Sequence, residues 1–152
     1  MKAWRILALV CVFAQPGLSA RPANPKAPLR LIQTIPLPGV EGRIDHLAWD
    51  AIGQRLFLAA LGNNTVEIID LKAGQRVKTM KGFHAPQGIL FLAESNQIVV
   101  SNGKGGAVEF FDGTSLQPLG SVRLSSDADT MRYDPSSKLV YVGYGEGGGS
   151  GH

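Results

Sequence analysis

Asp45 and His46 are adjacent in the chain, and their side chains have the clearest capacity for chemistry. Gln87 lies 42 residues after Asp45, and Asp129 lies a further 42 residues on. Carboxylate and amide oxygens bind hard cations such as Ca²⁺, and an imidazole extends the range to transition metals. We therefore expect a ligand-binding site made of Asp45, His46, Gln87 and Asp129. Three of these residues, Asp45, His46 and Asp129, are the expected ligands of a divalent cation.

A structural role for the same carboxylates is the alternative, and it is the simpler one. Asp side chains commonly accept hydrogen bonds from neighbouring backbone N–H groups in turns. In that case Asp45 and Asp129 would hold successive repeats of the chain in register, without binding a ligand.

Asp127 and Asp129 form a second pair of carboxylates, two residues apart. On an extended strand both side chains would face the same side. Such a pair raises one of the two pKa values and can support acid–base chemistry. A solvated loop with a turn cap explains the same residues, and no third catalytic partner can be assigned to them.

Motifs that mark common enzyme classes are missing from the sequence. No Ser/His/Asp set with a nucleophile elbow is found, and no haem, zinc or dinucleotide motif. Residues 103–106 combine three glycines with Lys104, but they lie between two expected strands, whereas a phosphate loop leads from a strand into a helix. These observations favour a role other than catalysis.

The elements that must position these side chains come from a repeat with a period of 42 residues. Residues 56–58 match residues 98–100 and 140–142, and residues 66–70 match residues 108–112. A fixed period of about 40–45 residues with β-type patterning is typical of propeller blades. We therefore expect an all-β chain built from propeller blades of four antiparallel strands.

The same order of strands is expected in each period. Inner strands are expected at residues 44–49, 88–92 and 130–133, second strands at 55–60, 97–101 and 139–143, third strands at 65–70 and 107–112, and outer strands at 31–35, 77–80 and 119–122. This makes about two and a half blades, whereas a closed propeller has about 4–8. We therefore expect an incomplete propeller, the N-terminal fragment of a longer one.

A family resemblance is carried by the start of the second period and by the second strands. Pro86-Gln87-Gly88 leads into an inner strand, and residues 97–102 and 139–144 are apolar strands of similar pattern. Over about residues 31–145 the chain resembles the YVTN-type seven-bladed propellers, although residues 43–46 lack the Pro-x-Gly. The resemblance implies an exported binding or scaffold protein, with a small molecule or a protein bound at the channel face.

Lactonase-type propellers are a more distant resemblance, which rests on the architecture and on acidic channel positions. It implies an alternative function, a metal-dependent hydrolase with its metal at the channel mouth. In that case Asp45, His46 and Asp129 would hold the metal, and the metal would activate a water molecule.

The N-terminal segment, 1–20, has the pattern of a signal peptide. Lys2 and Arg5 precede an apolar run at residues 6–13, and Leu18-Ser19-Ala20 ends in a small residue suited to cleavage. The run is far shorter than the roughly 20 residues that span a membrane. We expect a periplasmic or secreted protein with no membrane span after cleavage. The single cysteine, Cys11, lies within this segment, so the mature chain would have no thiol.

The rest of the chain is nearly neutral. The net charge is +3 at pH 7, and Lys2 and Arg5 supply two of the positive charges. A nucleic-acid surface needs a basic patch, so a nucleic-acid partner is not expected. The expected organisation is a signal peptide at 1–20, a Pro-rich leader at 21–30, a partial propeller at 31–145 and a Gly-rich tail at 146–152.

Overall fold

The structure is a computed structural model that describes residues 29–145. The chain divides into two compact units, Met1–Ile32 and Gln33–His152, and every strand lies in the second unit. The expected signal peptide at 1–20, residues 21–28 of the expected leader and the expected tail at 146–152 lie outside the described residues.

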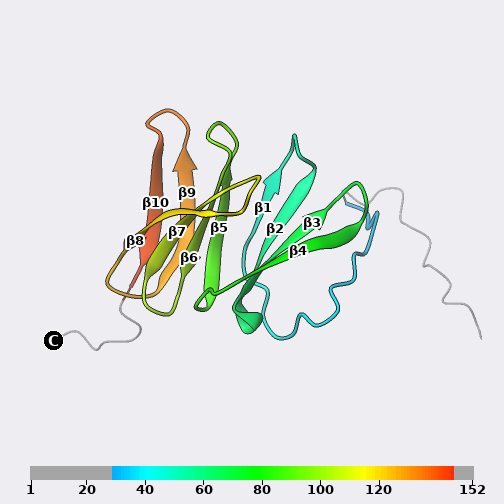
Figure 1. Cartoon of the computed structure of the whole chain (residues 1–152), viewed down its shortest axis with the longest axis horizontal. Coiled ribbons are helices and arrows are strands. Elements are labelled where there is room, and N and C mark those ends of the chain that lie inside the picture. Colours follow the sequence, from blue (N-terminus) through cyan, green and yellow to red (C-terminus); the bar gives the residue numbers. More distant parts are fainter. Residues whose placement is uncertain (1–28, 146–152) are drawn as a thin grey trace, which may run out of the picture. The chain divides into compact units, whose positions relative to one another are not determined.

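Ten strands form three antiparallel sheets, each made from consecutive strands (Figure 1). The first sheet has β1 (Leu47–Asp50), β2 (Arg55–Ala60), β3 (Thr65–Asp70) and β4 (Gln75–Lys81). The second has β5 (Pro86–Leu92), β6 (Gln97–Asn102), β7 (Ala107–Asp112) and β8 (Pro118–Arg123), and the third has β9 (Ala128–Asp134) and β10 (Leu139–Tyr144). The described chain is therefore all-β, with two four-stranded propeller blades and half of a third.

Helical structure within residues 29–145 is limited to one short 3₁₀ turn at Leu61–Asn63. This part of the chain contains no helix with the length and apolar character needed to cross a membrane.

The strand positions agree with the 42-residue period, apart from the start of the chain. Both expected third strands have the observed bounds, and most other strands differ from expectation by a residue or two. The expectation of an outer strand at residues 31–35 is wrong, because a strand needs a partner and none of the described strands pairs with this segment. The first inner strand begins at Leu47 rather than at residue 44, although Asp45 N–H still donates to Ala59 O at 2.9 Å.

Aspartates at the ends of strands fix the hairpin turns that join them. The Oδ1 atom of Asp50 accepts a hydrogen bond from Gly53 N–H at 2.8 Å, and Asp134 Oδ1 accepts one from Ser136 N–H at 2.9 Å. A carboxylate that bonds backbone N–H groups two or three residues on stabilises a turn at that point. The first and third blades therefore carry the same turn signal at equivalent positions, whereas the second blade has Leu92 there.

Apolar side chains fill the spaces between successive blades. Phe57 of β2 is fully buried, and its ring stacks on Phe91 of β5 with centroids 5.4 Å apart. Val99 of β6 and Met131 of β9 lie in a second cluster, against which Tyr133 packs. The two cores therefore hold the blades face to face.

Arg55 links the first two blades by polar contacts. Its Nη1 donates to Gly113 O of the second blade at 2.5 Å, and its Nη2 donates to Asp50 Oδ2 at 2.8 Å. The guanidinium carbon lies 5.1 Å from the centroid of the Phe57 ring and 5.7 Å from that of Phe91. The Arg55 side chain is 24% exposed, and cation–π interactions are stronger where the cation is partly removed from water.

Replacement of Phe57 by Ala is expected to lower the free energy of unfolding by about 3–5 kcal/mol, because a large buried side chain leaves a cavity. Urea unfolding measures the change. The matched control is Val77→Ala on β4, where the side chain is half exposed and the expected change is within about 0.5 kcal/mol. A cost for Phe57→Ala below about 1 kcal/mol would contradict the packing described.

The Asp50–Arg55 pair predicts a pH dependence of stability. Burial would raise the pKa of Asp50, but hydrogen bonds from Gly53 N–H and Arg55, with the charge of Arg55, lower it below its usual value. The pair therefore stabilises the fold above the unfolded-state pKa of about 3.9, and this is lost as pH falls through the lower folded-state pKa.

Asp50→Asn is accordingly expected to cost about 1–3 kcal/mol at pH 7. The difference between the variant and the natural protein should shrink as the pH falls below about 4. Urea unfolding at a series of pH values measures it. A difference that stays constant down to pH 2 would exclude the ionised Asp50 as its source.

Candidate functional site

The residues directly before β1 and the start of β9 meet in a cluster of Asp45, His46 and Asp129. Each of these residues offers one ligand atom, and the three atoms lie within 4.8 Å of one another. Asp45 and His46 directly precede β1, and Asp129 is the second residue of β9. The structure therefore brings together the three residues that the sequence predicted as ligands of a divalent cation.

Three polar atoms in this cluster are buried and make no hydrogen bond among the described residues: Asp45 Oδ2, His46 Nδ1 and Asp129 Oδ1. Two of them have charged or polar neighbours, since Arg43 Nη2 lies 3.0 Å from Asp45 Oδ2 and His46 Nδ1 lies 3.3 Å from Asp45 Oδ1. The Asp45 side chain is only 8% exposed. A buried polar atom without a partner is costly, and a buried charged group more so. A bound cation would compensate all three atoms at once.

Arg43 is the charged neighbour of Asp45. Its Nη2 donates to Asp45 Oδ1 at 3.0 Å and also lies 3.0 Å from Asp45 Oδ2, and its side chain is 67% exposed. An ion pair with so exposed a partner is worth under about 1 kcal/mol. The Asp45 carboxylate also lies beside the imidazole, with His46 Nδ1 3.3 Å from Asp45 Oδ1. Among the described residues, the hydrogen bond that the Asp45 side chain accepts comes from the Arg43 side chain.

Gln87 occupies the equivalent level of the second blade but is not one of the converging residues. Its Nε2 donates to Asp127 Oδ1 at 3.0 Å. Its backbone carbonyl accepts a hydrogen bond from His46 N–H at 3.3 Å, which joins the first blade to the second. Gln87 therefore holds the backbone of His46 and the carboxylate of Asp127, and its own side chain is directed to Asp127.

Asp127 and Asp129 do not act as the expected pair on one face of a strand. Asp127 precedes β9 and has a left-handed backbone, with φ of 41°. The alternation of side chains along a strand does not extend to such a residue. Asp127 is hydrogen-bonded by Gln87, whereas Asp129 lies with Asp45 and His46, so the two carboxylates have different neighbours.

Gly88 and Ser101 bring the second blade close to the backbone of Asp129. Ser101 Oγ accepts a hydrogen bond from Gly88 N–H at 2.8 Å and donates to Asp129 O at 2.5 Å. A Cβ atom on Gly88 would collide with Asp129 O, so no larger residue fits without movement of the backbone. The sequence did not single out these two positioning residues, although the Pro86-x-Gly88 pattern marks the place.

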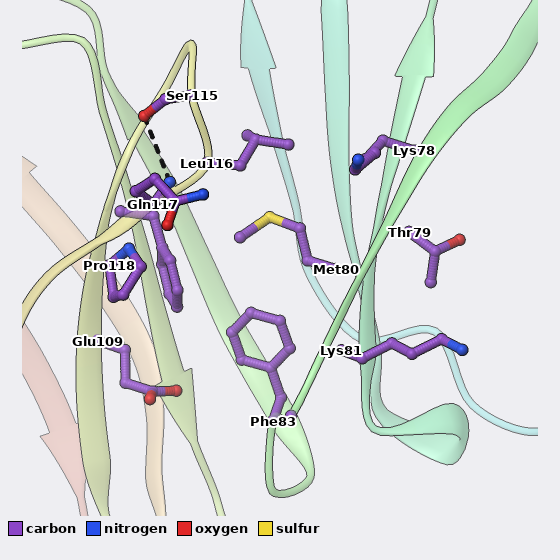
Figure 2. A pocket seen from close by; sticks show the side chains of 12 residues that line it. Lys78, Thr79, Met80, Lys81, Phe83, Glu109, Ser115, Leu116, Gln117 and Pro118 are labelled. Atoms are coloured by element: carbon purple, nitrogen blue, oxygen red, sulfur yellow. Dashed lines mark hydrogen bonds between the residues drawn. The ribbon is translucent and has the colours of Figure 1, made fainter.

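A separate cavity of about 450 Å³ lies between β4 and the β7–β8 hairpin (Figure 2). Met80 and Phe83 line it from one side and Leu116 from the other, and all three also belong to the packing between the first two blades. Lys78 and Glu109 are among its polar residues. It contains none of the converging residues and is the outer margin of the first core.

Comparisons with known proteins bear on the fold. No family model matches the chain, and no curated protein matches it. Among solved structures the chain is similar to Kuenenia stuttgartiensis hydrazine synthase, with a TM-score of 0.57 and 19% identity over 63% of this chain. The match covers 28% of that protein's chain. Likeness at this identity concerns architecture alone, and it supports the all-β arrangement of blades.

Gly88→Ala tests the close approach beside Asp129. The added methyl group would press on the backbone of the third blade, so we expect a loss of about 1–3 kcal/mol in the free energy of unfolding. Chemical denaturation measures it. Gly120→Ala on β8 is the matched control, because nothing lies within 4 Å of its added Cβ atom. Equal effects of the two substitutions would contradict the role given to Gly88.

Proposed function

We propose that this chain is part of an exported β-propeller that binds a ligand where its inner strands converge. A divalent cation held by Asp45, His46 and Asp129 forms part of that site. The observation that carries the proposal is the convergence of three ligand groups from two blades, in which Asp45 Oδ2, His46 Nδ1 and Asp129 Oδ1 are buried and make no hydrogen bond among the described residues. Support for export to the periplasm or the outside comes from the charged and apolar pattern of the N-terminal segment.

The ligand set indicates which cations fit. Zn²⁺ and Mn²⁺ bind well to a set of two carboxylates and one imidazole. Ca²⁺ prefers a set made of oxygen ligands alone. Ligand atoms on one ion with bonds near 2 Å are at most about 4 Å apart. Small side-chain rotations would therefore bring the three atoms, now within 4.8 Å, onto one ion.

Binding rather than catalysis is the proposed role of the site. The YVTN-type relationship is part of this proposal, and its support is the Pro86-x-Gly88 entry to an inner strand and the recurring apolar second strands. The partner is then a small molecule or a protein at the channel face, with the cation and the exposed Arg43 guanidinium as its charged contacts.

A metal-dependent hydrolase is the second candidate function, and one observation favours it. The His46 side chain is 37% exposed, so solvent reaches the cluster. Three protein ligands leave coordination positions for water and substrate, as in catalytic zinc sites. In this role the protein residues would hold the metal, and the bound water would attack an ester or a lactone.

Cation binding is the direct test of the site. Calorimetric titration with Zn²⁺ and Mn²⁺ is expected to give one ion per chain, and Asp129→Asn or His46→Ala should weaken binding by at least about tenfold. Asp127→Asn is the matched control, since this carboxylate is bonded to Gln87 and should leave affinity nearly unchanged. Titrations without binding, or equal affinity in all variants, would remove the cation from the proposal.

Hydrolysis assays separate the two candidate functions. The cation-loaded protein is mixed with simple esters and lactones, and circular dichroism checks that each variant is folded. Turnover that Asp45→Ala abolishes in a folded protein would favour the hydrolase. Retained cation binding without turnover of these substrates favours the binding role.

A further inference from the structure

Successive blades meet through one recurring pair of positions, one on a second strand and one on the next inner strand. Between the first two blades the pair is Phe57 and Phe91, whose rings stack at 5.4 Å. Between the second and third blades it is Val99 and Tyr133, which lie in the second core. Each member of the second pair lies 42 residues after its counterpart in the first, so the same two positions of the repeat contribute to both inter-blade cores.

The same two positions return at the two ends of the row of blades, and there they are exposed. Trp49 on β1 lies 42 residues before Phe91 and is 60% exposed. Tyr141 on β10 lies 42 residues after Val99 and is 58% exposed. Leu47, beside Trp49 on the same face, is 59% exposed, whereas its counterpart Ile89 is 4% exposed. Residues 29–145 therefore present both halves of their own blade contact, one on the first described blade and one on the last.

We propose that copies of this chain associate head to tail, with the Tyr141 face of one copy packed on the Leu47–Trp49 face of the next. The proposal is independent of the cation site. Tyr141 and Trp49 would form the aromatic pair that Phe57 and Phe91 form within one chain. Aromatic pairs stabilise contacts beyond the area that they bury.

A second copy is the favoured occupant because the contact continues an interface that this chain makes twice internally. The first sheet lies at one end of the row and the strand pair β9–β10 at the other (Figure 1). Arg132 is the partner of Tyr141 across β9 and β10 and is exposed, so it can stack on Trp49 as Arg55 stacks on Phe57. Within residues 29–145, β10 pairs with β9 alone, so its second edge is also open to a partner.

The proposed interface joins two different faces of the chain, so each face can be removed separately by substitution. Sedimentation velocity of the full chain over a range of concentrations should show species larger than the monomer. Trp49→Arg and Tyr141→Arg should each weaken association by about tenfold or more, because each removes one half of the contact. A mixture of the two variants should form a 1:1 dimer and nothing larger, since each retains the half that the other lacks.

Ile52→Arg is the matched control, because Ile52 is 92% exposed and lies in the β1–β2 turn, outside the strands that carry Trp49 and Tyr141. It should associate as the natural chain does. The milder Trp49→Gln and Tyr141→Gln repeat the test if circular dichroism shows that an arginine variant is not folded. A natural chain that stays monomeric would overturn the proposal. Other proteins would then be the expected partners of these faces. Large species that persist in both variants, or a mixture that stays monomeric, would also overturn it.

Discussion

The packing of each second strand on the next inner strand determines where everything else in the molecule lies. Phe57 on Phe91 fixes the spacing of the first two blades, and the Val99 cluster fixes the third. The polar site depends on this apolar spacing, because Asp45 belongs to the first blade and Asp129 to the third, with the second blade between them. Their ligand atoms come within 4.8 Å only when both cores are formed.

Much of the fold could be predicted because its determinants are local. The alternation of apolar residues and the Asp-opened turns recur with a single period, and this predicts the third strands at Thr65–Asp70 and Ala107–Asp112 with their observed bounds. The same period carries over to the site. It assigns Asp45, Gln87 and Asp129 to one level of three successive blades.

What the sequence could not provide depends on partners distant in the chain. Residues 31–35 have a strand pattern, but pairing requires a neighbour that none of the described strands supplies. Asp127 has a left-handed backbone, which the alternation rule does not anticipate. The Gln87 side-chain amide donates to Asp127, which lies 40 residues away in sequence. The Ser101 hydroxyl donates to the backbone carbonyl of Asp129, which lies 28 residues away and belongs to the next blade. Side-chain direction is decided by such contacts.

The separation of Asp45 from Asp129 by two full periods of the repeat gives the cluster a part to play in folding. No local segment contains the cluster, so it comes into being only after all three blades have docked. An ion held there would close a long loop and would bind the finished fold far better than any partly folded form. By mass action it would lower the population of forms in which the blades have separated, and so reduce proteolysis of those forms, increasingly so as the ion concentration rises above its dissociation constant.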